Sequence, residues 1–255
     1  MNFTILTLFP EMFKGYLESS ILGKAVEKEL ISVAIINIRD FSLDKHRTCD
    51  DAPYGGGPGM LLKPEPLSAA IESIEKRGRV IYLSPAGKIF NQDCVKELSR
   101  EDSLVLICGH YEGIDQRVID LYVTDEVSVG DYVLFSGEVG AMVILDAVSR
   151  LVEGVISEES VREESFQDGL LEYPQYTRPQ VFKNLRVPEV LISGNHANIR
   201  AWRMEKSLEK TLKFRPDLLK SINLSEAQLR ILKQIMEEGT SYEHDKDHRS
   251  KTIEG

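Results

Sequence analysis

The chain has little cysteine and no long hydrophobic run, and these shortages exclude several classes of protein. Its three cysteines in 255 residues are Cys49, Cys94 and Cys108, and none has the CxxC spacing of a metal site. An odd number of scattered thiols does not form a disulfide framework, so they are interpreted as buried or incidental. No segment approaches the roughly 20 apolar residues of a membrane-spanning helix. The apolar N-terminal stretch ends at Pro10, too early for a signal peptide. We expect a soluble, cytoplasmic protein with no membrane partner.

Positive charge is also scarce, with 31 Lys and Arg against 41 Asp and Glu and a net charge of -10. This balance argues against a polyanionic partner, because phosphate neutralisation needs cations. The deficit is uneven, however, since residues 173–235 carry 12 Lys and Arg against 5 Asp and Glu. Such a basic segment is typical of a nucleic-acid-binding module and also of a solvated helix face. Composition alone favours the solvated face.

Apolar, β-branched runs alternate with amphipathic stretches through the first 156 residues. Apolar strands separated by helices predict a parallel sheet with helices on both faces, and the pattern alone suggests an open, doubly wound α/β fold. Strands are expected at 3–9, 32–41, 79–85 and 104–109, and helices at 15–30, 66–76, 91–100 and 139–152. Ligands of such sheets bind outside the carboxyl ends of the strands. The loops at those ends are 50–60, 84–88, 109–117 and 128–138.

The C-terminal part of the chain has a different character. Residues 157–172 are strongly acidic and predict a flexible linker. Helical patterns at 196–214 and 224–238, with Ser225 as a candidate N-cap, predict a small helical domain over residues 173–238. Residues 239–255 cannot bury a core and are expected to be disordered.

Two glycine-rich loops, Cys108 to Arg117 and Val127 to Glu138, follow predicted strands and carry polar side chains. Backbone groups exposed there could bind the edge of an adenine or a ribose, although two ordinary β-to-α turns would look similar. The loop at 50–60, DDAPYGGGPGM, matches neither a Walker A loop nor a dinucleotide fingerprint. A demanding turn and a ligand loop are equally good interpretations of it.

Seven motifs give the chain a family resemblance. They are LFPEMF, RDFSLDKHRTCDDAPYGGGPGM, YLSPAG, CGHYEGIDQRV, SVGDYVLFSGE, SFQDGLLEYPQYTRP and VPEVLISGNH. Together they resemble the bacterial tRNA (guanine-N1)-methyltransferases, the TrmD family of the SPOUT superfamily, which methylate guanosine 37 beside the anticodon. The resemblance implies S-adenosylmethionine as methyl donor, tRNA as substrate and a homodimer with its active site between subunits. It also implies a parallel sheet with a deep trefoil knot, which periodicity cannot predict because knots are rare.

The resemblance places the cofactor contacts on the strand-end loops. At the matching positions stand Pro85, Gly109, Glu112, Val129, Gly130, Asp131, Tyr132, Val133, Leu134, Ser136 and Gly137. The chain departs from the family at His110, commonly arginine, and at residues 135–140, where FSGEVG replaces a Thr-Gly-Gly-Glu-Leu-Pro string. These departures bear on the shape of the pocket.

The resemblance also implies two catalytic groups, a carboxylate base at Glu164 and an arginine at Arg150. The family commonly has aspartate at the first position, and Asp168 is the nearest alternative base. Guanine N1 must lose its proton to become a nucleophile, and a guanidinium stabilises the charge that develops on the neighbouring carbonyl. From the residues alone, Glu164 would be a solvated linker charge and Arg150 a charge favoured at a helix C-terminus.

Partners and metals also follow from the resemblance. Magnesium dependence is associated with the family and Glu112 and Glu164 are candidate oxygen ligands, but no motif defines a metal site. The resemblance implies that the basic segment binds tRNA. Tyr176 and Trp202 are candidates to pack beneath a base or to fill the small core, and for Trp202 the core is favoured. Candidate phosphate contacts are Arg178, Lys183, Arg186, Arg200, Arg203, Lys206, Lys210 and Lys213. The alternatives are another knotted RNA methyltransferase and a non-catalytic RNA-binding homologue.

Overall fold

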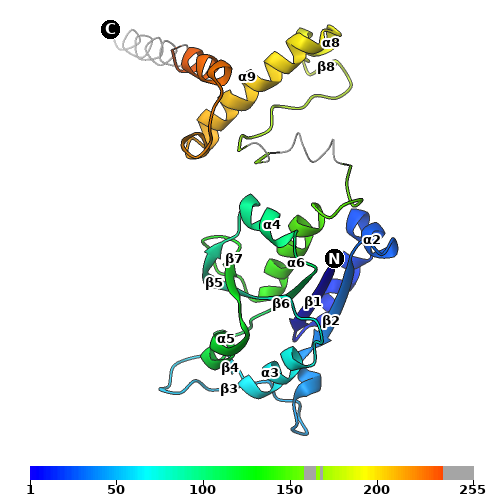
Figure 1. Cartoon of the computed structure of the whole chain (residues 1–255), viewed down its shortest axis with the longest axis vertical. Coiled ribbons are helices and arrows are strands. Elements are labelled where there is room, and N and C mark those ends of the chain that lie inside the picture. The colour runs from blue at the N-terminus through cyan, green and yellow to red at the C-terminus, as the bar shows by residue number, and fades with distance from the viewer. Residues whose placement is uncertain (158–164, 167–168, 238–255) are drawn as a thin grey trace. The chain divides into compact units, whose positions relative to one another are not determined.

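The computed structural model describes residues 1–157, 165–166 and 169–237. The chain divides into two compact units, Met1–Ser157 and Glu158–Gly255, and each is taken by itself (Figure 1). The predicted bases Glu164 and Asp168, most of the predicted linker and the tail at 239–255 lie outside the described residues. Among the residues described, no helix is both long and apolar enough to cross a bilayer.

A five-stranded sheet with the order β2-β1-β6-β5-β7 lies at the centre of the first unit. Every neighbouring pair of strands is parallel, so the predicted parallel sheet is confirmed. The central strand β1 places Phe3 between Val33 of β2 and Leu104 of β6. The strands are β1 (Asn2–Thr7), β2 (Ser32–Asn37), β5 (Arg79–Ile89), β6 (Ser103–Ile107) and β7 (Asp125–Ser128).

Helices cover both faces of this sheet, because successive side chains of a strand point to opposite sides (Figure 1). Ile5 and Leu106 belong to the core under α2, α4 and α6, whereas Leu6 and Ile107 belong to the core under α3 and α5. Two apolar cores result, one on each face. The helices are α2 (Ser20–Glu27), α3 (Pro64–Glu72), α4 (Gln92–Leu98), α5 (Gln116–Tyr122) and α6 (Gly137–Ser149).

Among the predicted elements whose extent differs from that observed, two are interrupted or cut short. The helix expected at 15–30 is split into α1 (Lys14–Leu17) and α2, and Ser20, the first residue of α2, is in the left-handed region at φ 59°. The strand expected at 32–41 ends at Asn37, whose side chain accepts a hydrogen bond from the backbone N–H of Arg39. That bond caps a 3-10 turn, η2 (Ile38–Phe41), which apolar periodicity cannot separate from a strand.

Strand β5 is longer than predicted, because the chain loops out in its middle. Leu83 and Lys88 both align with Val127 of β7, so residues 84–87 leave the ladder. A Cβ atom on Gly87 would lie 2.4 Å from the backbone carbon of Glu126, and only glycine allows this approach. The bulge carries Ser84 and Pro85 to the carboxyl edge of the sheet.

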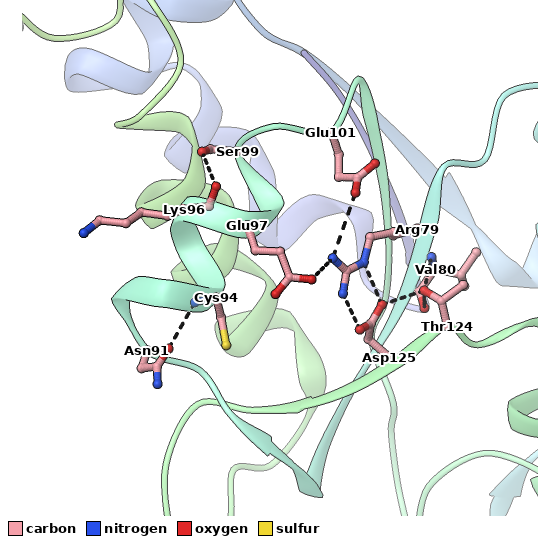
Figure 2. A network of polar contacts seen from close by, with 10 residues as sticks. All are labelled: Arg79, Val80, Asn91, Cys94, Lys96, Glu97, Ser99, Glu101, Thr124 and Asp125. Carbon is pink, nitrogen blue, oxygen red and sulfur yellow. Dashed lines mark hydrogen bonds and ion pairs between the residues drawn. The ribbon is translucent and has the colours of Figure 1, made fainter. Parts of the chain in front are cut away.

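A polar network around Arg79 joins β5 to its neighbours (Figure 2). The Arg79 guanidinium donates through Nε to Asp125 of β7 at 2.9 Å, and it also pairs with Glu97 of α4. The Thr124 hydroxyl donates to the same Asp125 carboxylate at 2.7 Å. The network lies at the amino end of β5, away from the residues that leave the ladder.

The second unit is built mainly on one long helix, α9 (His196–Phe214), whose bounds match the predicted 196–214. Ser207 and Thr211, buried on α9, hold the backbone of Leu171 through hydrogen bonds to its carbonyl and from its N–H. Residues 226–237 are helical, and the predicted cap is confirmed because the Ser225 hydroxyl accepts from Gln228 N–H. The remaining elements are η1 (Pro10–Phe13), β3 (Asp50–Asp51), β4 (Leu61–Leu62), β8 (Val181–Phe182), β9 (Leu185–Arg186), α8 (Glu189–Ile192) and η3 (Leu218–Lys220).

Candidate active site

A cavity of about 300 Å³ opens at the carboxyl edge of the sheet in the first unit. Its walls come from the middle of β5, where the chain leaves the ladder, from the end of β7, and from the loops that follow β6 and β7, in agreement with the strand-end rule. The lining residues are Tyr82, Leu83, Ser84, Pro85, Gly109, His110, Tyr111, Glu112, Gly113, Val127, Ser128, Val129, Gly130, Tyr132, Val133, Leu134, Phe135, Ser136, Gly137 and Gly140.

The residues singled out as cofactor contacts are brought together here. All of them line the cavity except Asp131, which lies between two that do. The sequence separates Pro85 from Gly137 by about a third of the first unit, and the parallel strands return both to one edge. Their contacts with a cofactor remain a prediction. The structure shows that these residues share one location.

Close backbone packing shapes the floor of the cavity. Gly137 N–H donates to the Gly109 carbonyl at 2.8 Å. A Cβ on Gly137 would lie 2.7 Å from Cys108 Cα, and one on Gly109 would lie 2.8 Å from the Tyr82 ring. These glycines therefore allow the two loops to touch, which any side chain would prevent.

The glycine-rich loop at 50–60 supports one wall without lining the cavity. It connects β3 and β4, which pair antiparallel, and Gly55, Gly56, Gly57 and Gly59 all have positive φ. Glu112 N–H donates to the Met60 carbonyl at 3.0 Å, and a Cβ on Gly59 would collide with the Glu112 side chain. Of the two interpretations left open, the described geometry favours the demanding turn.

Most departures from the family pattern line this cavity, namely His110, Phe135, Ser136 and Gly140. The His110 ring packs 5.0 Å from the Phe9 ring and 4.7 Å from the Tyr111 ring, measured between centroids, so it belongs to an aromatic stack. Phe135 is fully exposed at the cavity's rim, and Gly140 lies beside Leu83 and Val129 at its wall.

The predicted catalytic residues are not brought to this cavity within the described chain. Arg150 caps the C-terminal end of α6, whereas the N-terminal end of that helix lines the cavity. A helix of 13 residues separates the two ends by about 20 Å. Glu164 and Asp168 lie outside the described residues. Arg150 of one chain is therefore too distant to act in the cavity of that same chain.

Two buried residues next to the cavity form a pair that the sequence did not predict. Glu138 and Thr7 are both 0% exposed, and the Thr7 hydroxyl donates to the Glu138 carboxylate at 2.6 Å. Glu138 belongs to a predicted polar loop, and glutamate is ordinary in the first turn of a helix. Thr7 lies in an apolar strand, so nothing in the pattern links residues 131 positions apart.

The structure gives limited support to metal or thiol chemistry. Across residues 1–157, 165–166 and 169–237, no group of three or more His, Cys, Asp or Glu side chains is placed to hold a metal. Glu112 lines the cavity, and the other candidate ligand, Glu164, is not described. All three cysteines are free, with Cys49 and Cys108 buried as expected. Burial, together with the nearby Glu138, raises the pKa of the Cys108 thiol.

The basic residues of the second unit differ in their accessibility. Arg178, Lys183, Arg186, Arg200 and Lys213 are exposed. Lys206 is half-buried and pairs with Glu209 at 2.6 Å, and the Arg203 guanidinium lies 4.7 Å from the centre of the Tyr173 ring. Trp202 is also half-buried, with its ring centroid 6.3 Å from that of Tyr176.

The fold and the cavity define an α/β protein with a ligand site at the carboxyl edge of a parallel sheet. Comparison with known proteins gives the particular family. The chain belongs to the family described as tRNA (Guanine-1)-methyltransferase TrmD, which matches residues 1–221. The resemblance drawn from the motifs is thereby confirmed, and the chain is an enzyme of the transferase class.

Curated relatives match nearly the whole chain. The tRNA (guanine-N(1)-)-methyltransferase of Treponema denticola is 62% identical over 220 residues, which cover 86% of this chain and 90% of the relative. That of Caldanaerobacter subterraneus subsp. tengcongensis is 57% identical over 237 residues, covering 92% and 98%. That of Treponema pallidum is 53% identical over 239 residues, covering 93% and 96%.

Proposed function

We propose that this enzyme transfers a methyl group from S-adenosylmethionine to N1 of guanosine 37 in tRNA. The observation that carries the proposal is the cavity at the carboxyl edge of the sheet, where the family's cofactor positions meet in a chain that belongs to the family. The names of the relatives specify guanine N1 of tRNA as their target. Position 37 and the cofactor are inferred from family membership.

The cavity suits a nucleoside-containing cofactor. Its floor is backbone at Gly109 and Gly137, and its walls combine apolar side chains such as Leu83 and Val129 with the hydroxyls of Tyr82 and Ser136. A largely apolar pocket with a few polar groups is the usual site for such a ligand. When bound, S-adenosylmethionine supplies an electrophilic methyl group on a sulfonium.

Two side chains of this enzyme carry the chemistry that we propose. The carboxylate of Glu164, with Asp168 as the alternative, accepts the proton of guanine N1. The nitrogen lone pair then forms the N1–CH3 bond as the bond from sulfur to methyl breaks, leaving a neutral thioether. The guanidinium of Arg150 stabilises the negative charge that develops on the guanine carbonyl oxygen. The remaining contribution of the protein is alignment.

The position of Arg150 supports a homodimer with a shared active site. This residue lies at the far end of α6, about 20 Å from the end that lines the cavity of its own chain, so we propose that a second copy supplies it. Exposed apolar side chains support such an interface: Val139 and Val143 lie one turn apart on α6 and are 47% and 43% exposed, and Val133 is 85% exposed. Apolar surface of this kind marks contact sites.

We further propose that residues 1–156 form a deeply knotted domain, and residues 173–238 a tRNA-binding domain joined to it by the segment 157–172. The strand order, with β6 between β1 and β5, and the contact of Gly137 with Gly109 support the knot. The exposed cations Arg178, Lys183 and Arg186 support the second role, since phosphate contacts need accessible positive charge. Magnesium, with Glu112 as a ligand, belongs to the same proposal.

Calorimetry with S-adenosylmethionine separates this function from that of a non-catalytic RNA-binding homologue, because the latter would bind no cofactor. A methyl-transfer assay on tRNA transcripts then tests the base. We expect Glu164→Gln to lose most activity, on the order of 100-fold or more, and Asp168→Asn to lose less. Full activity in Glu164→Gln with loss in Asp168→Asn would move the base to Asp168. Full activity in both variants would favour another knotted RNA methyltransferase, one that needs no carboxylate base.

A further inference from the structure

A carboxylate is buried directly beneath the cavity. Glu138 is 0% exposed and lies in the first turn of α6, flanked by Gly137 and Gly140, which both line the cavity. Its Oε1 accepts the Thr7 hydroxyl at 2.6 Å, while Oε2 is buried with no hydrogen-bond partner among the described residues. Burying a carboxylate with so few partners is costly, so a functional benefit is expected.

Thr7 connects this carboxylate to the central strand. It is the last residue of β1, and its hydroxyl oxygen also accepts the N–H of Phe9 at 2.9 Å. The Phe9 ring in turn packs against His110, at the cavity wall. One hydroxyl therefore fixes the turn after β1 and the start of α6 together.

The neighbouring backbone bonds join the same three segments. Cys108 N–H donates to the Leu6 carbonyl at 2.9 Å, and Gly137 N–H donates to the Gly109 carbonyl at 2.8 Å. The hydrogen bond between Thr7 and Glu138 adds a side-chain contact between β1 and α6. The ends of β1 and β6 and the start of α6 are therefore all joined to one another. The positive end of the α6 dipole favours a negative charge at this position.

We propose that Glu138 is a positioning residue, which braces the N-terminal turn of α6 against Thr7 and thereby holds the two loops that line the cavity. It touches no ligand in this proposal and acts through Gly137 and the loop that begins at Gly109. The inference rests on the proposed function only for the identity of the ligand. The bracing itself concerns the free protein.

Hydrogen exchange followed by mass spectrometry tests the brace without any ligand. In Glu138→Met, which removes the acceptor oxygens at a similar side-chain length, and in Thr7→Val, which removes the donor, we expect amides of 108–113 and 129–137 to exchange faster by about tenfold. Thr7→Ser keeps the hydroxyl and should behave as the wild type. The double variant Thr7→Val/Glu138→Met should add little to either single change, because both remove the same hydrogen bond.

Ser149→Ala is the matched control, since Ser149 is buried at the other end of α6 and its hydroxyl also lacks a described partner. It should leave both segments unchanged. Wild-type exchange in Glu138→Met would overturn the proposal, as would an equal effect of Ser149→Ala. If Thr7→Val does not fold, Glu138→Met decides alone.

Calorimetry with S-adenosylmethionine supplies the second readout. We expect Glu138→Met to weaken its binding by about tenfold, and Thr7→Ser and Ser149→Ala to leave it unchanged. Wild-type affinity in Glu138→Met would overturn the role of the brace in binding. A wild-type protein that binds no S-adenosylmethionine would instead overturn the proposed cofactor, and the exchange rates would still decide whether Glu138 braces the loops.

Discussion

At the scale of single residues, the cavity depends on glycines, which have no side chain, as much as on the side chains that line it. A methyl group on Gly137 would lie 2.7 Å from Cys108 Cα and 2.8 Å from Gly109 N, and backbone atoms cannot move aside cheaply. We expect Gly137→Ala to force the two loops apart and to weaken S-adenosylmethionine binding by 100-fold or more, on the order of 3 kcal/mol. Calorimetry measures this loss directly.

Gly15→Ala is the control for that substitution, because a Cβ on this helical glycine meets nothing within 4 Å. It should bind the cofactor normally and gain about 0.5–1 kcal/mol of stability from the better helix propensity of alanine. Equal binding by the two variants would show that the close contact of the loops does not shape the site.

The residues of the site could be predicted unevenly from the sequence. Glycine and polar residues at strand ends identified the two loops, and the motif resemblance selected Pro85 and the segment 129–137 within them. The buried pair of Thr7 and Glu138 could not be predicted, since burial and a contact across 131 residues arise only in the folded chain. The place of Arg150 relative to the cavity also depends on the fold.

At the scale of elements, the pair of Arg79 and Asp125 joins β5 to β7 and both side chains are 24% exposed. The Arg79 guanidinium lowers the pKa of Asp125 by hydrogen bonding. A carboxyl group with a depressed folded pKa stabilises the fold above its unfolded pKa of about 3.9, and this stability is lost as pH falls through the folded value. We expect Asp125→Asn to cost about 1–2 kcal/mol at pH 7 and less at pH 3, where the contribution has begun to be lost.

Urea unfolding at the two pH values measures this effect in the first unit. Asp40→Asn is the control, because its pair with Arg47 is exposed at both side chains and should contribute little. A cost of Asp125→Asn that is independent of pH would contradict the assigned cause.

The helix over residues 226–237 begins with a capping box. Ser225 Oγ accepts from Gln228 N–H at 3.3 Å, and the Gln228 side chain accepts from Ser225 N–H at 2.8 Å. We expect Ser225→Ala to lose about 1 kcal/mol locally, seen as about fivefold faster amide exchange in the first turns of the helix. Ser225→Asp should retain the cap and the slow exchange. Unchanged exchange in the alanine variant would mean that the cap does not limit opening.

Elements were easier to predict than their ends. Strong periodicity gave α9 its observed bounds, and apolar runs gave four of the sheet strands. Local side-chain bonds such as that of Asn37, and the bulge that closes around Gly87, altered the ends because they compete with periodicity at single positions. Connectivity of the knotted kind has no periodic signature at all.

At the scale of the whole molecule, the proposed homodimer predicts complementation between subunits, because Arg150 and the cavity of one chain lie at opposite ends of α6. Arg150→Ala and Gly137→Ala should each be nearly inactive alone. After subunit exchange, a mixed dimer has one site with an intact cavity from the Arg150→Ala chain and Arg150 from the other chain. We expect mixing to restore about a quarter of wild-type methyl transfer at equal amounts, because half of the dimers are mixed and each has one active site.

Each inactive variant taken alone through the same subunit exchange, at the same total amount of protein, is the control, and it should restore nothing. If activity stays absent in the mixture of the two different variants although mass spectrometry shows mixed dimers, the active site is not shared in this way.

The central claim is methylation of guanine N1 at position 37, and mapping the product tests it most directly. Two tRNA transcripts, identical except for guanosine or adenosine at position 37, are incubated with the enzyme and S-adenosylmethionine, then digested and analysed by mass spectrometry. The account predicts one methyl group on guanine N1 at position 37 of the first transcript and none on the second. Methylation of both transcripts at another nucleotide, or at a ribose, would contradict it.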